Sequence, residues 1–264
     1  MHVTILGSGS AGNCALVETG QTRLLVDGGL SARQMVARLA LCGVNPLEID
    51  GILLTHEHGD HTGGLTVWCR QFATPIYANS LTAEVLRREA GPLKKDWRVF
   101  VTGSEFTIRD VTVQTFPVPH DAVDPVGFVL HGENHALGLL TDLGFATKLV
   151  YERVRAAQTL VIEANHCEKL LQNCTKRPWS VKQRITSRHG HLSNTAAAGV
   201  IAELLNANLR RAVLGHLSRD CNRPELAVGA VRERAGDAAL EVFCAMQREI
   251  SPRFSVDGRD AQAA

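Results

Sequence analysis

The segment HEHGDH, residues 56–61, brings three imidazoles and a carboxylate together in a short run: His56, His58, Asp60 and His61. It follows the apolar stretch IDGILLT, which predicts a β-strand. Neutral imidazole and carboxylate are ligands that zinc, manganese and iron take in proteins, and Gly59 allows the loop to curl so that they converge. The alternative is a polar loop with a chance cluster of histidines. A multi-ligand run is far more specific than a lone histidine, so the sequence predicts a metal site at the end of this strand.

The same run, extended to THEHGDHTGG, resembles the HxHxDH signature of the metallo-β-lactamase superfamily. Four further positions fit the family pattern: Asp27 in LLVDGG, His120 in VPHDAVDP, Asp142 in LLTDLG and His216 in LGHLS. The resemblance implies two divalent ions, zinc, manganese or iron. It assigns one ion to His56, His58 and His120, the other to Asp60, His61 and His216, and a bridging position to Asp142. Two ions about 3.5–4 Å apart activate water as a nucleophile at neutral pH.

The elements that must position these residues follow from the apolar pattern of the chain. Short apolar runs closed by turns predict strands over 1–30 and 97–140, and helical spacing is found over 31–43 and in several segments after residue 145. The fold class is α+β, and the resemblance implies a four-layer αββα sandwich, the metallo-β-lactamase fold. We expect one domain over residues 1–250 and a flexible C-terminal tail over 251–264, because the last stretch is polar.

The segment IEANH, residues 162–166, follows a predicted strand and carries two ionisable side chains. Glu163 and Ala164 resemble the HEAT-type motif of ribonuclease Z-like members, although Ile162 stands where that motif begins with histidine. The likeness suggests proton-transfer roles for Glu163 and His166. The alternative is an ordinary strand end with a surface histidine.

The segment GHLSN, residues 190–194, precedes a predicted helix. Free backbone N–H groups at a helix N-terminus, with an imidazole beside them, suit a phosphate group. His191, Ser193 and Asn194 are therefore candidate contacts to a substrate phosphate. The alternative for Ser193 and Asn194 is helix capping alone.

Between these two segments, residues 169–191 carry six basic residues, no acidic residue and an aromatic residue, Trp179. A predicted helix near 167–173 leads into a predicted loop. The basic residues are Lys169, Lys176, Arg177, Lys182, Arg184 and Arg188. Basic side chains with an aromatic among them can bind a phosphodiester strand. We expect Lys182, Arg184 and Arg188 to contact substrate phosphates, with a solvated loop as the alternative.

Seven motifs in matching order resemble the YycJ/WalJ-like branch of the superfamily: GSGSAGN, THEHGDH, VPHDAVDPVGF, LTDLG, IEANH, GHLSN and GHLS. The branch implies an exonuclease-like metallohydrolase that acts on DNA, and RNA stays open. We expect single-stranded or end-exposed nucleic acid as the partner, and Asp60, Glu163, His166 and His191 as the catalytic residues. The alternatives are a small-molecule cyclic phosphodiesterase, a thioesterase and a non-catalytic metal-binding module.

The composition sets the remaining expectations. The chain has 264 residues, 45% of them hydrophobic, and a net charge of +1, which is ordinary for a globular protein. No apolar run reaches the roughly 20 residues that cross a bilayer, and the first residues lack the pattern of a signal peptide. Seven cysteines without a CxxC pair favour free thiols in the cytoplasm.

Overall fold

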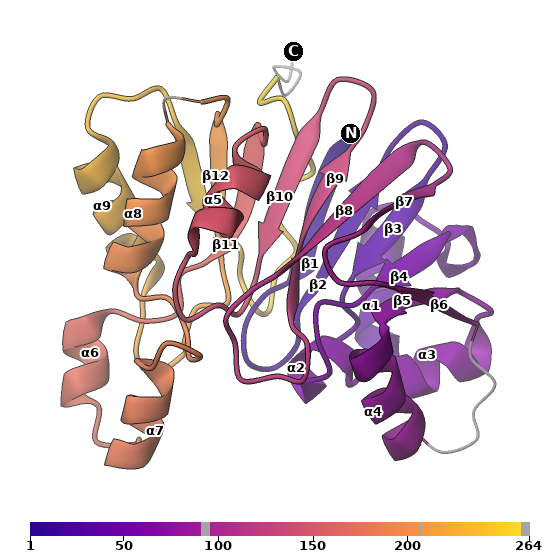
Figure 1. Ribbon diagram of the computed structural model, residues 1–264, viewed down its shortest axis with the longest axis horizontal. Coiled ribbons are helices and arrows are strands. Elements are labelled where there is room, and N and C mark those ends of the chain that lie inside the picture. The colour runs from indigo at the N-terminus through magenta and orange to yellow at the C-terminus, as the bar shows by residue number, and fades with distance from the viewer. Residues whose placement is uncertain (91–95, 206, 260–264) are drawn as a thin grey trace.

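The computed structural model describes residues 1–90, 96–205 and 207–259, in which two β-sheets pack face to face between two layers of helices (Figure 1). Each sheet has seven strands. The helices α1, α3 and α4 lie on the outer side of one sheet, and α5, α8 and α9 on the outer side of the other. The expected four-layer αββα sandwich is confirmed.

The first sheet has the order β14-β1-β2-β3-β4-β5-β6. Strands β14, β1, β2 and β3 pair antiparallel, whereas β3, β4, β5 and β6 run parallel. The bounds are β1 His2–Gly7, β2 Cys14–Glu18, β3 Arg23–Val26, β4 Gly51–Leu53, β5 Ile76–Asn79, β6 Trp97–Phe100 and β14 Phe254–Ser255. The inner strands are apolar along their length because both faces of the sheet are covered.

The second sheet has the order β13-β12-β11-β10-β9-β8-β7. Its β10 to β13 run parallel and β7 to β10 pair antiparallel. The bounds are β7 Glu105–Ile108, β8 Val111–Pro117, β9 Val126–His131, β10 Ala136–Leu140, β11 Thr159–Glu163, β12 Arg211–Gly215 and β13 Glu241–Cys244. The carboxyl ends of its parallel strands therefore meet at one edge of the sheet.

Nine α-helices and one short 3-10 helix connect the strands of the described chain. Their bounds are α1 Ala32–Leu41, the 3-10 helix Pro46–Glu48, α2 Gly59–Thr62, α3 Leu65–Gln71, α4 Ser80–Ala90, α5 Lys148–Val154, α6 Glu168–Asn173, α7 Trp179–Ile185, α8 Asn194–Leu204 and α9 Pro224–Ala235. No helix within the described ranges has the length and apolar character that a membrane span requires.

Three apolar clusters fill the three interfaces of the sandwich. Leu24 and Phe128 belong to the cluster between the two sheets. Met35 and Trp68 pack between the first sheet and its helices, and Ile201 packs in the corresponding cluster of the second sheet. Burial of about 25 cal/mol per Å² of apolar surface stabilises each interface, so strand ends at the edge of the sandwich are free to carry polar residues.

Two expectations about local structure are corrected. The predicted helix near 167–173 is α6, whereas the loop expected after it contains a further helix, α7. Both helices project from the edge of the second sheet (Figure 1). The expected flexible tail packs as far as it is described: β14 pairs with β1, and Phe254 and Val256 are buried. A two-residue strand is too short to show a period in the sequence. Residues 260–264 lie outside the described part.

Candidate metal centre

The candidate ligands leave the strands at one edge of the sandwich. Asp27 follows β3, the HEHGDH loop follows β4, Asp142 follows β10 and His216 follows β12. Asp27, Asp142 and His216 have positive φ angles of 62°, 52° and 55°, a conformation that residues other than glycine rarely adopt. Such strained positions cluster at functional sites, and here three of them turn the chain at the same edge.

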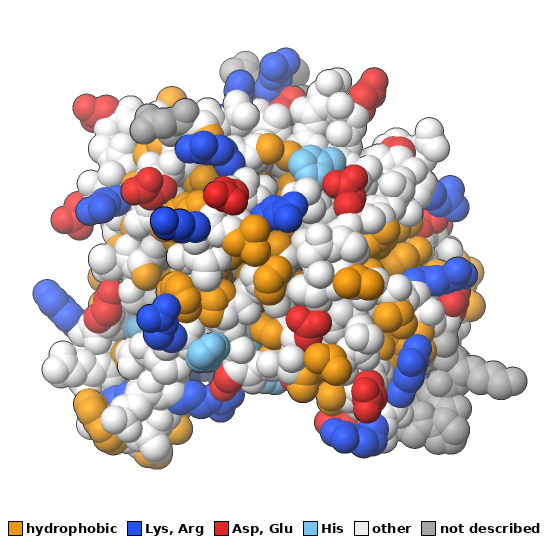
Figure 2. Space-filling model, viewed as in Figure 1, with side chains coloured by type: hydrophobic (Ala, Val, Ile, Leu, Met, Phe, Trp, Pro, Cys, Tyr) orange, Lys and Arg blue, Asp and Glu red, His pale blue; other side chains and the backbone are white. Residues whose placement is uncertain are grey.

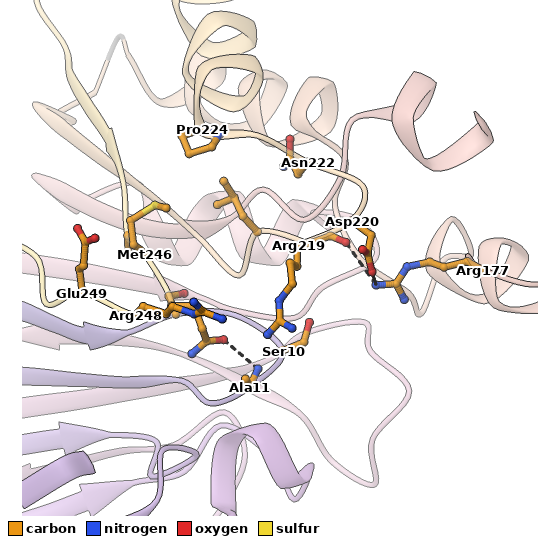
Figure 3. Close-up of a pocket in the computed structure, with 15 residues that line it drawn as sticks. Ser10, Ala11, Arg177, Arg219, Asp220, Asn222, Pro224, Met246, Arg248 and Glu249 are labelled. Carbon is orange, nitrogen blue, oxygen red and sulfur yellow. Dashed lines mark hydrogen bonds and ion pairs between the residues drawn. The ribbon is translucent and has the colours of Figure 1, made fainter. Parts of the chain in front are cut away.

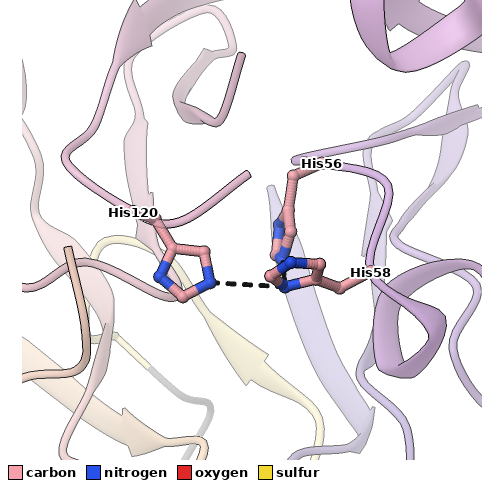
Figure 4. Close-up of side chains that lie close together, drawn as sticks. All are labelled: His56, His58 and His120. Carbon is pink, nitrogen blue, oxygen red and sulfur yellow. Dashed lines mark hydrogen bonds between the residues drawn. The ribbon is translucent and has the colours of Figure 1, made fainter. Parts of the chain in front are cut away.

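Four groups of side chains at this edge have ligand atoms within 4.8 Å of one another. The groups are His56, His58 and His120; His56, His61 and Asp142; Asp60, His61 and His216; and Asp142, Glu163, His191 and His216. Figure 4 shows the three histidines of the first group pointing toward one another, with 3.1 Å between His56 Nε2 and His58 Nδ1 and 3.4 Å between His120 Nε2 and His58 Nδ1. The structure thus brings together all seven residues that the sequence predicts as ligands.

The chemistry of this donor set fits divalent cations. Asp142 is 2% exposed, and its Oδ2 atom has no hydrogen-bond partner although His61 Nε2 lies 2.9 Å away. A buried carboxylate oxygen without a donor is costly, and a bound cation would satisfy it. The pKa of His61 is raised to about 10 because Asp142 and Asp27 outweigh the lowering effect of burial. The carboxylates therefore attract positive charge to this place, which a metal ion can supply in place of a proton.

The second ring nitrogen of His61, Nδ1, is held by a carboxylate on the side away from Asp142. Its Nδ1 lies 2.7 Å from Asp27 Oδ2, which leaves Nε2 directed at Asp142. Thr55 fixes Asp27 in turn, through its backbone N–H and its hydroxyl, at 2.9 and 3.0 Å from Oδ1. Asp27, which fits the family's early aspartate, is a positioning residue here, and Thr55 is a support that sequence reasoning missed.

The glycine-rich segment GSGSAGN near the N-terminus is a second support that the sequence did not identify. The backbone N–H of Asn13 donates to the carbonyl of Asp60 at 2.8 Å, and Asn13 Nδ2 lies 3.1 Å from His61 Nε2. Ser8 Oγ accepts a hydrogen bond of 2.7 Å from the backbone N–H of His216. The segment therefore joins the candidate ligands of the two sheets; the sequence placed it in a family motif without indicating this role.

Glu163, at the end of β11, is fully buried and lies behind two histidines. Its Oε1 is 2.6 Å from His191 Nδ1 and 2.9 Å from His216 Nδ1. Its Oε2 accepts from the backbone N–H groups of Leu143 and Leu192 at 3.2 and 3.0 Å. Such a carboxylate cannot touch a substrate, so the geometry gives Glu163 the role of orienting both imidazoles.

His191 lies beside the ligands, with a side chain that is 22% exposed. Its ring centre is 5.2 Å from that of His120 and 5.3 Å from that of His216. Although burial lowers it, the pKa of His191 is raised by the carboxylate of Glu163. Because Nδ1 is held by Glu163, Nε2 is the atom available to a bound molecule.

His166, Ser193 and Asn194 occupy different places from those expected. His166 is 2% exposed, its Nδ1 has no hydrogen-bond partner, and it belongs to none of the ligand groups found among the described residues. Ser193 caps α8 through the backbone N–H of Ala196 at 3.2 Å. Asn194 is buried and exchanges two hydrogen bonds of 2.8 Å with Asn222. Capping and internal pairing occupy Ser193 and Asn194, which corrects their assignment to phosphate.

The three expected basic contacts each have a partner within the chain. Lys182 Nζ donates to the carbonyl of Gln172 at 2.7 Å, and the Arg188 guanidinium lies 4.4 Å from the ring centre of Phe145. Arg184 Nε is 2.5 Å from a carboxylate oxygen of Asp121. Arg184 lines a recess of about 140 Å³ that His191 also lines, whereas Lys182 and Arg188 do not line it. Only Arg184 of the three is placed beside the ligands.

In the space-filling view, histidine side chains are visible at the lower edge of the molecule, toward the notch between the α6–α7 region and the α4 corner (Figure 2). The notch is where the strand ends of both sheets meet. The site is therefore open to solvent on one side, although most of its ligands are buried.

The sequence matches the profile of the beta-lactamase superfamily domain over residues 22–217. It is 36% identical over 247 residues to "Exodeoxyribonuclease YycJ" of Bacillus anthracis, covering 92% of this chain and 93% of that protein. It is 37% identical over 242 residues to "Exodeoxyribonuclease WalJ" of Streptococcus pneumoniae, covering 90% of each.

Solved structures agree in fold. The metallo-β-lactamase fold protein YhfI of Bacillus subtilis has a TM-score of 0.70 at 21% identity, covering 95% of this chain and 98% of that one. Zn²⁺-bound PqqB of Methylobacterium extorquens has a TM-score of 0.71 at 17% identity, with coverage of 95% and 99%.

Proposed function

Because the chain belongs to the beta-lactamase superfamily, we propose that its metal centre hydrolyses the phosphodiester bonds of DNA and that the protein acts as an exonuclease. The observation that carries the proposal is the recess beside the ligand groups, which His191, Arg177 and Arg184 line together. Asp121 also lines the recess and pairs with Arg184, so the imidazole of His191 and the guanidinium of Arg177 are the groups that suit an anionic substrate such as a phosphodiester. The names of both relatives support DNA as that substrate.

We assign the ligands in two sets. His56, His58 and His120 would hold one divalent ion, Asp60, His61 and His216 would hold the second, and Asp142 would bridge them. Imidazole and carboxylate suit zinc, manganese and iron alike.

Bound divalent ions would supply a water nucleophile at neutral pH and stabilise the charge that develops on the phosphate. The chain's own residues orient the substrate. Glu163 holds His191 Nδ1 at 2.6 Å, so His191 Nε2 can donate to a phosphate oxygen or to the leaving oxygen. Arg177 lines the recess and would neutralise the adjoining backbone phosphate, whereas the charge of Arg184 is paired with Asp121.

A substrate panel tests the proposal directly. Purified protein loaded with zinc, manganese or iron would be given single-stranded DNA, duplex DNA, RNA, a cyclic nucleotide and a thioester. We expect metal-dependent release of nucleotides from DNA ends, and turnover of bis-p-nitrophenyl phosphate. Faster turnover of the cyclic nucleotide would favour the small-molecule phosphodiesterase, and turnover of the thioester alone would overturn the proposal. The cytoplasmic location also stays a prediction, which fractionation of cells would test.

A further inference from the structure

A cleft of about 620 Å³ lies next to the recess of the metal centre. The cleft and the recess share three lining residues, Ser10, Arg177 and Ser218. The two therefore adjoin, with Arg177 on the boundary between the recess at His191 and the cleft. The cleft falls within the roughly 300–1,000 Å³ range of pockets that bury a small organic ligand.

One wall of the cleft carries three arginines from three different parts of the chain. Arg177 lies between α6 and α7, Arg219 follows β12 and Arg248 follows β13. Figure 3 shows their side chains around the cavity, with Arg219 directed at Ser10 and Arg177 beside Asp220. Because no single element carries the three charges, the fold itself assembles them.

Two acidic residues, Asp220 and Glu249, also line the cleft, against three arginines. Asp220 lies 2.8 Å from Lys176 Nζ and 3.9 Å from Arg177 Nη2, so its charge is shared with a lysine outside the cleft. The Nε atom of Arg177 is buried without a hydrogen-bond partner. Among the described residues, Arg219 and Arg248 form no ion pair. A guanidinium group without an ion-pair partner is suited to a phosphate, because it can donate two parallel hydrogen bonds to two phosphate oxygens.

The facing wall is apolar. Leu217, Pro224 and Met246 line it, and Met246 is 43% exposed. Figure 3 shows Pro224 and Met246 on the side of the cavity away from Ser10. An apolar wall can pack against a flat, weakly polar ring system such as a nucleobase. It offers no hydrogen-bond donor to a phosphate group. The two walls together therefore call for one ligand with both parts.

We propose that this cleft binds a nucleotide of the DNA strand next to the scissile bond, with its phosphate on Arg219 and Arg248 and its base on the apolar wall. The inference rests on the proposed nuclease function, and it deepens that function by naming where the strand lies. The recess holds the bond at the metal ligands, and Arg177 stands at the passage to the neighbouring nucleotide.

The test compares the double variant Arg219→Ala/Arg248→Ala with a matched control, Arg155→Ala. Arg155 lines a cavity of the same volume, about 620 Å³, between α5 and the end of α8, remote from the metal ligands. Calorimetric titration would use deoxyadenosine monophosphate, deoxyadenosine and inorganic phosphate as probes of the metal-loaded protein. We expect the monophosphate to bind more tightly than either fragment, and the double variant, unlike the control, to weaken its binding at least tenfold.

A kinetic measurement accompanies the titration. We expect the double variant to raise KM for a single-stranded oligonucleotide at least tenfold. We also expect the log–log salt dependence of its binding to become shallower by about 1.4, at about 0.7 for each lost phosphate contact. Unchanged KM and salt slope would overturn the cleft assignment, and so would inorganic phosphate binding as tightly as the monophosphate. Bis-p-nitrophenyl phosphate reports the metal centre separately: failure of the wild type to turn it over contradicts the nuclease function and leaves the nucleotide titration to judge the cleft.

Discussion

Replacing Glu163 with glutamine exchanges one carboxylate oxygen for an NH2 group in the most enclosed part of the centre. The carboxylate accepts four hydrogen bonds, two on each oxygen: His191 and His216 on Oε1, and the backbone N–H groups of Leu143 and Leu192 on Oε2. An amide has only one acceptor oxygen, and its other terminal atom is a donor. Glutamine can therefore satisfy one of the two pairs and must oppose the other.

The two orientations of the amide have different costs. If the nitrogen faces Leu143 and Leu192, two buried N–H groups lose their acceptor, at about 1–3 kcal/mol each. If it faces the histidines, His216 Nδ1 must accept, and the proton moves to His216 Nε2. That nitrogen lies 3.3 Å from Asp60 Oδ2 and is the atom that a metal ion would use. Loss of an outer hydrogen bond of this kind typically costs about 10–100-fold in metal affinity or activity.

The assay separates these costs. We expect metal affinity of Glu163→Gln, measured by competition with a chelator, to fall about 10–100-fold. We also expect the melting temperature of the metal-free protein to fall by roughly 4–24 °C, since the two lost hydrogen bonds together cost about 2–6 kcal/mol and each kcal/mol lowers it by about 2–4 °C in a chain of this size. Glu18→Gln is the control, because Glu18 is also buried but pairs with Arg253 at 3.1 Å, away from the ligands. Metal affinity within twofold of wild type, together with an unchanged melting temperature, would refute the positioning role of Glu163.

Three further predictions concern the ligands, the backbone and the thiols. Asp60→Ala should lower the metal content from about two ions per chain to about one and abolish hydrolysis while the circular dichroism spectrum is kept, and wild-type activity would contradict the two-metal assignment. Gly29→Ala should destabilise the protein by about 1–3 kcal/mol in denaturant titration, because its Cβ would lie 1.7 Å from the carbonyl oxygen of Asp60. Gly199→Ala in α8 meets nothing within 4 Å and should stabilise by about 0.5–1 kcal/mol; equal effects would refute the contact argument. Burial raises the pKa of the Cys244 thiol to about 11, whereas hydrogen bonds from following backbone N–H groups outweigh burial and lower the pKa of Cys174. Since the thiolate is the nucleophile, iodoacetamide at pH 8 should label Cys174 first by mass spectrometry, and the reverse order would count against it.

The candidate metal ligands could be picked out of the sequence because their signal is local. Three histidines and an aspartate within residues 56–61 are visible without any tertiary information. The remaining ligands, His120, Asp142 and His216, follow apolar strands, and the family resemblance identified them. The parallel strands β3, β4, β10 and β12 bring the residues that follow them to one edge, whereas His120 follows the antiparallel strand β8.

The supports of the centre could not be predicted in the same way, because they depend on contacts between distant segments. Ser8 and His216 are 208 positions apart, and Asn13 and Asp60 are 47 apart. Serine, threonine and asparagine in a glycine-rich stretch also fit an ordinary turn. Neither the amino-acid composition nor the hydrophobic periodicity of a segment indicates which polar side chain will contact a candidate ligand from the other sheet.

The ion pairs of the basic segment 169–191 also could not be predicted from the sequence. The sequence lists its cations, but their acidic partners lie elsewhere: Arg184 pairs with Asp121, and Lys176 pairs with Asp220. A charge paired in this way is less available to a strand of DNA. Arg177, which the sequence did not single out, is the cation of this segment that lines both the recess and the cleft.

The centre and the cleft differ in how the fold holds them, and this difference bears on specificity. The candidate ligands directly follow strands of both sheets, beside large apolar clusters, so a change there costs stability as well as metal binding. The α6–α7 region that carries Arg177 packs through a small cluster of buried residues, Leu171, Ile185 and Cys221, and Arg219 and Arg248 are exposed. Substitutions at exposed positions typically change stability by no more than about 0.5 kcal/mol. The choice of substrate can therefore change at the cleft while the hydrolytic chemistry stays fixed at the strand ends, and the two should respond independently to mutation.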